Sequence, residues 1–461
     1  MAEAALSPRQ IDQAGLCIGC GACAAGREAM AWDRFGQLKP AGAWTGQASE
    51  SFARICPFSP AARDETEIAD ARFPDARLRD PRIGAYEAAY VGHVAENGFR
   101  AGGSSGGMTS WVAAELLRQG LVDGVAHVAP ADPEQDGRFF AYRISRSEAE
   151  VQGGARSRYY PVELSDVLAE IRAVPGRYAV IGIPCFIKAV RLLQQEDPII
   201  ADRILFTLGL FCGHMKSARL VESFAWQLGA PMEEVRAVEY RLKNPDRPAN
   251  WYTAHLTLAD GSTRWQDWWH LADGDWGASF FQNSACDYCD DVVAETADIS
   301  FGDAWLEPYS SDGRGTNVVI VRSPVIHRLV QHAISERRLD LTPVDQEFIV
   351  ETQAAGLRHR REGLAYRLNI APPPLPLRKR VQPGGQALPL RRKFVYHARR
   401  AIARWSHPVA AFAHRRHLPS LYVGWARVAL HLYQAITYLR GPLGRVIAFA
   451  EFLTNRSRPV T

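Results

Sequence analysis

Three cysteines spaced two residues apart constrain this chain more than any other feature of its sequence. Cys17, Cys20 and Cys23 lie in "GLCIGCGACAAG", and Cys56 follows in "ICPFSP". The first residues, "MAEAALSPRQIDQAG", lack the basic start and apolar core of a secretory signal, so we expect a reducing, cytoplasmic environment in which close cysteines bind metal or react. A tight CxxCxxC with a remote Cys-Pro is typical of the ligands of a 4Fe–4S cluster. A zinc site with four cysteine ligands is the alternative, although zinc sites more often use two separated CxxC pairs.

Four further cysteines lie later in the chain and form a second set. Cys185 and Cys212 each follow an apolar, strand-like run, "RYAVIGIP" and "ILFTLGLF", whereas Cys286 and Cys289 form the CxxC of "CDYCDD". Sites in α/β folds are built at the carboxyl ends of such strands. The set therefore suits a second 4Fe–4S cluster. Two alternatives stay open: Cys185 and Cys212 as inert core thiols, and the CxxC as a redox couple or half of a zinc site.

The order of apolar runs along the chain predicts an α/β core. Strand-like "AAYVGHVA", "GVAHVAP" and "RYAVIGIPC" alternate with helix-like "MTSWVAAELLRQG", "LSDVLAEIRAV" and "FIKAVRLLQQ". A length of 461 residues leaves room for more than one unit around that core, and a hydrophobic fraction of 47% is enough to bury a sizeable interior. We expect a mixed sheet in the core, and "APPPLPL" at 371–377 marks a linker.

The net charge of +4 conceals a basic tail. Residues 375–461 hold 16 Lys and Arg and a single acid, Glu451, whereas the other 374 residues hold 38 basic and 49 acidic side chains. Because the basic character is local, it gives no reason to expect nucleic acid as a partner. Apolar residues recur at helical spacing in the tail, which predicts amphipathic helices that either pack on the core or lie against an anionic membrane surface. Pro408 is expected to kink or divide the first helix, and Arg427 and His431 disfavour a membrane span in the second.

Two glycine-containing loops indicate a phosphorylated cofactor. "RAGGSSGGMTSW" (100–111) leads into a helix with many unobstructed backbone N–H groups, and "GGARSRYYPV" (153–162) adds cationic, hydroxyl and aromatic side chains. Neither loop is a Walker A motif or a GxGxxG fingerprint, so each alone is a weak signal and an ordinary loop is the alternative. The two together predict a nucleotide-type cofactor in the α/β core.

Taken in order, these motifs resemble the coenzyme F420 (deazaflavin) hydrogenase/dehydrogenase beta-subunit family. The resemblance covers roughly residues 10–345 and rests on CxxCxxC with a remote CP, "GGSSGGMT", "GGARSRYYPV", "GIPCFIKAVRLL", "GLFCGH" and "CDYCDDVVAETADISFGDAW". The family contains flavin and iron–sulfur oxidoreductases, among them deazaflavin-reducing subunits and ferredoxin-linked reductases of chlorophyll precursors. "ICPFSP" and the long acidic spacer resemble bacterial members associated with exopolysaccharide synthesis. The tail after residue 370 has no counterpart in these motifs.

The resemblance implies two 4Fe–4S clusters and a flavin, with FAD expected rather than FMN. It supports as cluster ligands Cys17, Cys20, Cys23 and Cys56 at one site and Cys185, Cys212, Cys286 and Cys289 at the other. It assigns the flavin to Gly103, Ser104, Ser105, Gly106, Gly107, Thr109, Ser157, Arg158 and Tyr159. Asp303 in "FGDAW" matches a position close to the second cluster, with a turn or helix-cap aspartate as the alternative. The implied division is a ferredoxin-like iron–sulfur segment (1–78), a flavin-binding part of the core (79–165), a second part with the second cluster (166–345), a linker (346–377) and a basic helical extension (378–461).

The function implied by the resemblance is that of an oxidoreductase that passes electrons between a ferredoxin-like protein and an organic substrate through two clusters and FAD. A deazaflavin reductase, a non-enzymatic electron-transfer subunit of a polysaccharide-biosynthesis complex and a zinc-stabilised scaffold are the alternatives. The expected location is the cytoplasm, with residues 378–461 attached peripherally to the inner face of an anionic membrane. His214, Lys216 and Lys188 lie near the cysteine motifs, but the sequence identifies neither a catalytic acid nor the substrate.

Overall fold

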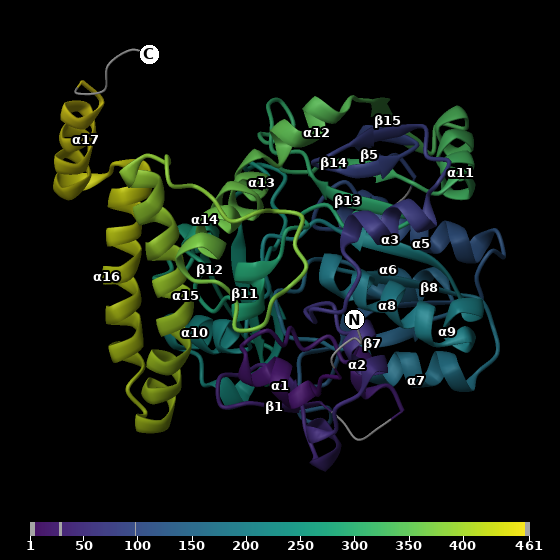
Figure 1. The fold of residues 1–461 in the computed structure, drawn as a ribbon, viewed down its shortest axis with the longest axis horizontal. Coiled ribbons are helices and arrows are strands. Elements are labelled where there is room, and N and C mark those ends of the chain that lie inside the picture. The colour runs from purple at the N-terminus through teal and green to yellow at the C-terminus, as the bar shows by residue number, and fades with distance from the viewer. Residues whose placement is uncertain (1–4, 27–29, 97, 457–461) are drawn as a thin grey trace.

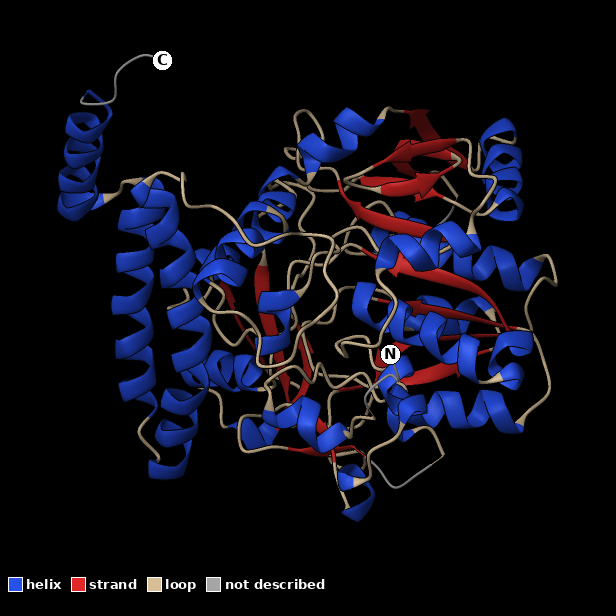
Figure 2. Cartoon of the chain, viewed as in Figure 1, coloured by secondary structure: helices blue, strands red, loops and turns tan. Residues whose placement is uncertain are grey.

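An eight-stranded mixed sheet forms the core of the molecule in the computed structural model, which describes residues 5–26, 30–96 and 98–456 (Figures 1 and 2). Neighbouring strands follow the order β15-β5-β14-β13-β9-β8-β6-β7. β6, β8, β9 and β13 run parallel, and antiparallel pairs flank them on both sides. The strands are β5 Ala88–Val94, β6 Gly124–Pro130, β7 Phe140–Ser145, β8 Tyr178–Gly182, β9 Ile204–Leu210, β13 Ile299–Asp303, β14 Asn317–Val321 and β15 Leu339–Pro343. The predicted α/β core on a mixed sheet is confirmed.

The central strands are buried on both faces, which explains their continuous apolar sequence. Successive residues of a strand point to opposite faces, and in β8 Tyr178 and Val180 belong to one buried cluster whereas Ala179 and Ile181 belong to another. The first cluster includes residues of α7 and α8, and the second includes residues of α5 and α11. The helices of this region are α4 Phe99–Gly102, α5 Met108–Arg118, α6 Glu148–Gly153, α7 Ser165–Ala173, α8 Pro184–Glu196, α9 Pro198–Arg203 and α11 Pro324–Ser335.

The N-terminal segment shares the core of the sheet instead of forming a globule of its own. Ile11 and Phe52 belong to the same buried cluster as Tyr178 of β8. Each of its three α-helices begins at a side-chain cap, Ser7, Ser49 or Asp64, which accepts a backbone N–H from the first turn. The elements are α1 Pro8–Gln13, η1 Ala22–Ala24, β1 Met30–Trp32, β2 Leu38–Pro40, η2 Ala43–Gly46, α2 Glu50–Ile55, α3 Glu65–Arg72, β3 Leu78–Asp80 and β4 Gly84–Tyr86.

A small antiparallel sheet and a layer of helices adjoin the main sheet (Figure 1). The sheet comprises β10 Val235–Glu239, β11 Thr253–Leu258 and β12 Thr263–Asp267, beside α10 Arg219–Leu228. The 3-10 turns of this part are η3 Met232–Glu234, η4 Trp268–His270, η5 Trp276–Ala278 and η6 Ser284–Tyr288. The layer is formed by α15 Leu390–Arg416, α16 Pro419–Tyr438 and α17 Gly441–Arg456.

The predicted helical extension is present, and its inner face packs on the core. Ile402, Tyr422 and Tyr433 are buried in one cluster with Phe281. α15 continues through Pro408 as a single helix, so of the two predicted effects of this proline, a kink or a division, the division does not occur. Within the described ranges, none of the helices combines the length and the hydropathy that crossing a membrane requires.

The stretch predicted as a linker, 346–377, is largely helical. It contains α12 Gln346–Thr352, α13 Ala354–Arg360 and α14 Glu362–Ile370, and only the residues from 371 onward match the linker prediction. Ile349, Leu357 and Leu364 anchor these helices because all three side chains are buried against the core. The proline-rich composition begins at residue 371, so the sequence indicates a linker over 371–377 and not over the helical residues that precede it.

A buried charge cluster ties two helices to the sheet. The carboxylate of Asp298, just before β13, lies 2.7 Å from Nη2 of Arg191 in α8 and accepts the backbone N–H of Thr207 in β9 at 2.7 Å. Arg72 of α3 donates to its other oxygen at 3.0 Å. Asp298 is fully buried and Arg191 is 5% exposed, so the pair is held away from solvent.

We predict that Asp298→Asn destabilises the protein strongly. Removing one partner leaves the Arg191 charge buried without compensation, which costs about 3–5 kcal/mol. Urea unfolding followed by circular dichroism measures the loss. The matched control is Asp123→Asn, which breaks the exposed pair with Arg177 and is expected to leave the midpoint nearly unchanged. Equal effects of the two substitutions would contradict the assignment.

Candidate functional site

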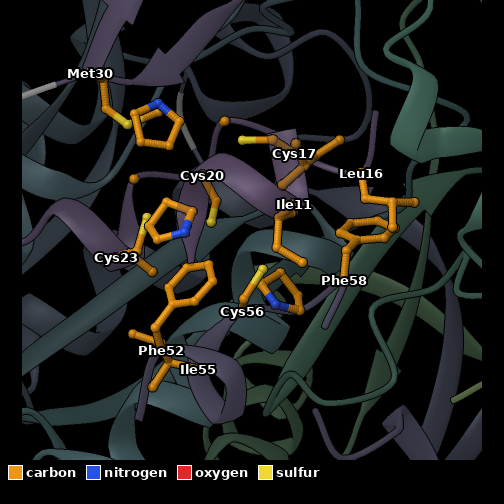
Figure 3. A pocket seen from close by; sticks show the side chains of 17 residues that line it. Ile11, Leu16, Cys17, Cys20, Cys23, Met30, Phe52, Ile55, Cys56 and Phe58 are labelled. Atoms are coloured by element: carbon orange, nitrogen blue, oxygen red, sulfur yellow. The ribbon is translucent and has the colours of Figure 1, made fainter. Parts of the chain in front are cut away.

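The first cysteine set lines one cavity of about 30 Å3. Cys17 and Cys20 lie on the loop after α1, Cys23 lies in η1, and Cys56 caps the C-terminus of α2 (Figure 3). The remaining walls are mostly apolar, and the cavity exceeds the roughly 10–15 Å3 that one water needs. The fourth cysteine of this set is therefore the one predicted from the sequence, and α2 carries it back to the CxxCxxC loop.

The glycines of the CxxCxxC loop are required by the protein itself. Gly19 and Gly21 have φ of +76° and +77°, which other residues rarely adopt. A Cβ on Gly19 would lie 2.5 Å from the carbonyl oxygen of Leu38, and one on Gly21 would lie 2.4 Å from Glu163 Oε2. Both positions therefore require glycine because other parts of the same chain, at Leu38 and Glu163, approach the loop closely.

The second cysteine set lines a smaller cavity of about 10 Å3 at the carboxyl ends of β8 and β9. Cys185 is the second residue of α8, and Cys212 follows β9. Cys286 lies in η6 and accepts the backbone N–H of Met215 at 3.3 Å, and Cys289 caps that turn. Residues about 75 positions apart in sequence thus face one space, as the strand-end argument predicts.

Neither cysteine set is arranged to hold a single metal ion. In the described part of the chain, no three His, Cys, Asp or Glu side chains lie close enough together to hold one metal ion. All eight cysteines are free of disulfides, and burial raises the pKa of their thiols, to about 12 for Cys20 and about 11 for Cys286. Neutral, buried thiols around a shared space become thiolates when they ligate metal.

The two cavities are neighbours. Ile18 and Phe58 line both of them, so the two cavities share a wall at these side chains. The backbone N–H of Leu164 donates to the carbonyl oxygen of Cys20 at 2.9 Å and fixes the CxxCxxC loop against the core. Ile18 lies within the CxxCxxC loop and Phe58 lies within "ICPFSP", but the motifs define the cysteines and not these positions, so the sequence did not predict the wall.

The two glycine-containing loops meet in space. The backbone N–H of Ser157 donates to Ser104 Oγ at 2.8 Å, which joins the loop before α5 to the loop after α6. Lys243 holds the first loop by donating to the carbonyl oxygens of Ser105 and Arg314, at 2.8 and 2.7 Å. The loop comprising Gly103, Ser104, Ser105, Gly106 and Gly107 leads directly into α5, where Thr109 is the second residue.

Gly106 is constrained by the strands behind it. A Cβ there would lie 2.8 Å from Asn317 Oδ1 and 2.8 Å from the carbonyl oxygen of Gly92. Asn317 Oδ1 also accepts the backbone N–H of Met108, the first residue of α5, at 3.1 Å, so this N–H group already has a hydrogen-bond partner. Gly102, by contrast, faces open space. Gly106 thus lies in close contact with β5 and β14, and these contacts require glycine whether or not a ligand binds to the loop.

Arg158 and Tyr159 lie at the inner end of the second loop. The side chain of Arg158 is 6% exposed; its Nη1 lies 3.4 Å from Glu239 Oε1 without hydrogen-bond geometry, and its Nε has no hydrogen-bond partner. The ring of Tyr159 packs on Trp276 with centroids 4.5 Å apart, and the ring of His214 stacks on the same Trp276 at 4.4 Å. Trp276 therefore connects the candidate flavin loop with the loop that carries Cys212.

The other titratable candidates have structural partners. Lys188 lies 3.1 Å from Glu65 in a buried ion pair, and Asp303 forms a two-point pair with Arg241 at 2.8 and 3.2 Å. Asp303 is not among the residues that line the second cavity. Burial lowers the pKa of His214 well below its usual range and that of Lys216 to about 7, despite the opposing charge of Asp273.

Basic residues from 354–380 close the second cysteine site, and sequence reasoning missed them. Arg360 of α13 lines the cavity. Lys379 lies 3.5 Å and Arg380 3.6 Å from the carboxylate of Asp290, which follows Cys289 directly. The basic runs "RHRR" (358–361) and "RKR" (378–380) were the available signal. The first falls in the predicted linker and the second in the basic tail, and the acidic loop that they approach lies some 70 to 90 residues earlier.

Comparison with known proteins identifies the family of the chain. The family model for coenzyme F420 hydrogenase/dehydrogenase, beta subunit N-term, matches residues 89–169, and the model for the C terminus of that subunit matches 176–347. Together they span more than half of the chain. A chain of the F420-reducing NiFe hydrogenase complex from Methanosarcina barkeri aligns with 17% identity and a TM-score of 0.49, over 65% of this chain and 98% of that one, too low to carry an argument. No curated protein matches the sequence.

We predict that Gly106→Ala lowers stability independently of any flavin. The added methyl group would overlap Asn317 and the backbone of β5, and such overpacking costs about 1–3 kcal/mol. Gly102→Ala, four residues away and facing open space, is the matched control and is expected to leave unfolding unchanged. Denaturant unfolding of protein stripped of small molecules measures both. A Gly106→Ala protein as stable as Gly102→Ala would show that this glycine is kept for a ligand.

Proposed function

The chain belongs to the coenzyme F420 hydrogenase/dehydrogenase beta-subunit family, and from this premise we propose that it is an iron–sulfur flavoprotein that passes electrons between a ferredoxin-like protein and an organic substrate. The observation that carries the proposal is the succession of three adjoining sites. The first cysteine cavity shares Ile18 and Phe58 with the second, and Trp276 lies between the loop of the second and Tyr159.

Each site has residues that fit the group proposed for it. The first cluster would be held by Cys17, Cys20, Cys23 and Cys56, and the second by Cys185, Cys212, Cys286 and Cys289. The flavin would be held by Gly103, Ser104, Ser105, Gly106, Gly107, Thr109, Ser157, Arg158 and Tyr159. Bound there, each cluster carries one electron and FAD carries two, which joins a one-electron carrier to a two-electron reaction.

The residues around these sites would bind the cofactors and shield them from water. The unpartnered Nε of buried Arg158 is free to donate to an anionic group such as a phosphate. The apolar walls of the first cavity, including Ile11 and Phe52, exclude water from the thiols. Tyr159 and Trp276 present aromatic surface where the loops converge, which suits a planar ring system. Eight free cysteines fit a reducing location such as the cytoplasm.

A second candidate function is reduction or oxidation of the deazaflavin F420 itself. The family description favours it, since F420 is the coenzyme after which the matched subunits are named. Its discriminating property is hydride exchange with F420 in the absence of any other organic substrate. A subunit that only relays electrons to a protein partner would reduce neither F420 nor a small molecule.

We predict about eight irons, eight acid-labile sulfides and one FAD per chain after anaerobic purification. Cys20→Ala and Cys286→Ala should each remove half of the iron, because they act on separate cavities, while the flavin stays bound. Metal analysis, sulfide assay and flavin release measure these contents. Stoichiometric zinc without iron, or loss of all iron from a single substitution, would contradict the two-cluster proposal.

We also propose that the outer face of α15 and α16 lies on an anionic membrane surface. Neither helix contains an Asp or Glu. The exposed apolar side chains are Leu390, Phe394, Trp405, Phe412, Leu418, Leu421, Val428 and Leu432. Exposed arginines are interspersed among them at 404, 415, 416 and 427. Aromatic and aliphatic groups that dip into a bilayer, with arginines at the headgroups, are typical of peripheral attachment.

We predict that Trp405→Ser, Phe412→Ser and Val428→Ser together abolish flotation with anionic phosphatidylglycerol vesicles at low salt. These side chains are 55%, 41% and 61% exposed, so their loss should not affect folding. Neutral phosphatidylcholine vesicles are expected to bind much less, because the arginines then lack partners.

The matched control replaces exposed apolar residues elsewhere, Leu78→Ser, Val174→Ser and Ile199→Ser, which are 46%, 41% and 45% exposed. This variant should float like the wild type. Equal flotation of both triple variants would contradict the membrane surface. The proposal would also be contradicted if the wild-type protein did not bind the vesicles and instead self-associated through the outer face of α15 and α16.

A further inference from the structure

Arg360 is a buried cation without a carboxylate partner, placed against the second cysteine set. Its side chain is 2% exposed, and it lines the same cavity as Cys185, Cys212, Cys286 and Cys289. Nη1 donates to the carbonyl oxygens of Cys286 and Cys289, at 2.7 and 3.3 Å, and Nη2 donates to that of Gly213. Nε has no hydrogen-bond partner. Among the described residues, no carboxylate oxygen lies within 4.0 Å of the guanidinium.

A guanidinium in this position needs negative charge nearby. A buried charge costs free energy unless it is paired, and arginine does not escape the cost by losing its proton. Asp291 also lines the cavity, but its oxygens accept the backbone N–H groups of Val293 and Glu295 at 2.9 and 3.0 Å. The four cysteines are the remaining source, and they are anionic when they ligate metal.

Arg360 itself lies beyond the family-matched ranges, although the carbonyl oxygens that it contacts lie within them. α13 ends at Arg360, thirteen residues after the matched range ends at 347. Arg367 of α14 donates to the carbonyl oxygen of Asp287 at 2.9 Å, and Lys379 pairs with Asp290. Three basic residues from this region therefore fasten the CDYCDD loop, but of the three only Arg360 reaches the cavity.

Among the described residues, no Lys or Arg lines the cavity of the first cysteine set. Lys39 Nζ donates to the carbonyl oxygen of Cys17 at 2.6 Å, but the same amino group lies 3.4 Å from Asp12 Oδ1. The lysine charge is thus offset by a carboxylate, and Lys39 is not among the residues that line the first cavity. Of the two cavities, the second has a basic side chain, Arg360, among its lining residues and the first does not.

We propose, resting on the proposed function, that Arg360 is a positioning residue that raises the reduction potential of the second cluster above that of the first. Reduction adds one electron and one negative charge to a cluster, with no bond made or broken. A fixed cation beside the cluster stabilises the reduced state. Electrons that enter at the first site are therefore drawn through Ile18 and Phe58 to the second.

The test is an anaerobic redox titration of the full-length holoprotein, followed by electron paramagnetic resonance with dithionite as the electron source. Arg360→Gln removes the charge but keeps an amide donor, and Arg360→Lys keeps the charge. Arg322→Gln is the control, since Arg322 is also fully buried, donates to Ser300 Oγ and the carbonyl oxygen of Ile83, and lines neither cavity. Iron, sulfide and flavin contents are measured on every sample.

We expect Arg360→Gln to weaken reduction at one of the two clusters at least tenfold, a downward shift of about 59 mV for a one-electron couple. Arg360→Lys should retain most of the wild-type potential, and Arg322→Gln all of it. Unchanged potentials in a fully loaded Arg360→Gln protein, or equal shifts at both clusters, would overturn the proposal. If Arg360→Gln does not bind iron at the second site, the test rests on Arg360→Lys. A wild-type potential in Arg360→Lys then supports the proposal, and a potential lowered by about 59 mV or more overturns it. Wild-type protein without iron would instead overturn the proposed function.

Discussion

The parallel pairing of β8 with β9 is the constraint on which the redox site depends. This pairing brings Cys185 and Cys212, which are more than two dozen residues apart in sequence, to the same edge of the sheet. Local structure alone could not bring the two cysteines together. The CDYCDD loop and the N-terminal segment then only have to fold over an edge that already exists. Because β8 is buried on both faces, that edge is held rigidly, and rigid support is what a cluster with fixed ligand geometry requires.

Opposite charges from distant parts of the chain complete the site. The loop that carries Cys286 and Cys289 is acidic and buried, and such a loop is stable only when cations are buried with it. Arg360, Lys379 and Arg380 supply them from a region that the family models do not cover. The C-terminal part of the chain is therefore integral to the redox centre, and its outer helices are left to make contacts of their own.

The sequence predicted the parts of the site that depend on short motifs. The mixed α/β core was predicted correctly, and the structure brings each cysteine set to one cavity and joins the two glycine-containing loops. It did not predict the wall of Ile18 and Phe58, or Arg360, because these are ordinary residues whose roles come from long-range packing. Helices in 346–370 were missed for the same reason, since their short apolar pattern only makes sense against the core. The resemblance assigned Gly106 to the flavin, whereas its close contacts with Gly92 of β5 and Asn317 of β14 come from long-range packing that the sequence does not reveal.

The central claim is that the two cysteine sites are neighbours that share one wall. If both hold clusters, their unpaired electrons in the fully reduced protein are close enough to interact magnetically. The most direct measurement is the electron paramagnetic resonance spectrum of dithionite-reduced protein, compared with that of Cys56→Ala, which lacks the first site. The account predicts a split, broadened spectrum that collapses to one simple signal in the variant. A wild-type spectrum equal to the sum of two independent signals would contradict it.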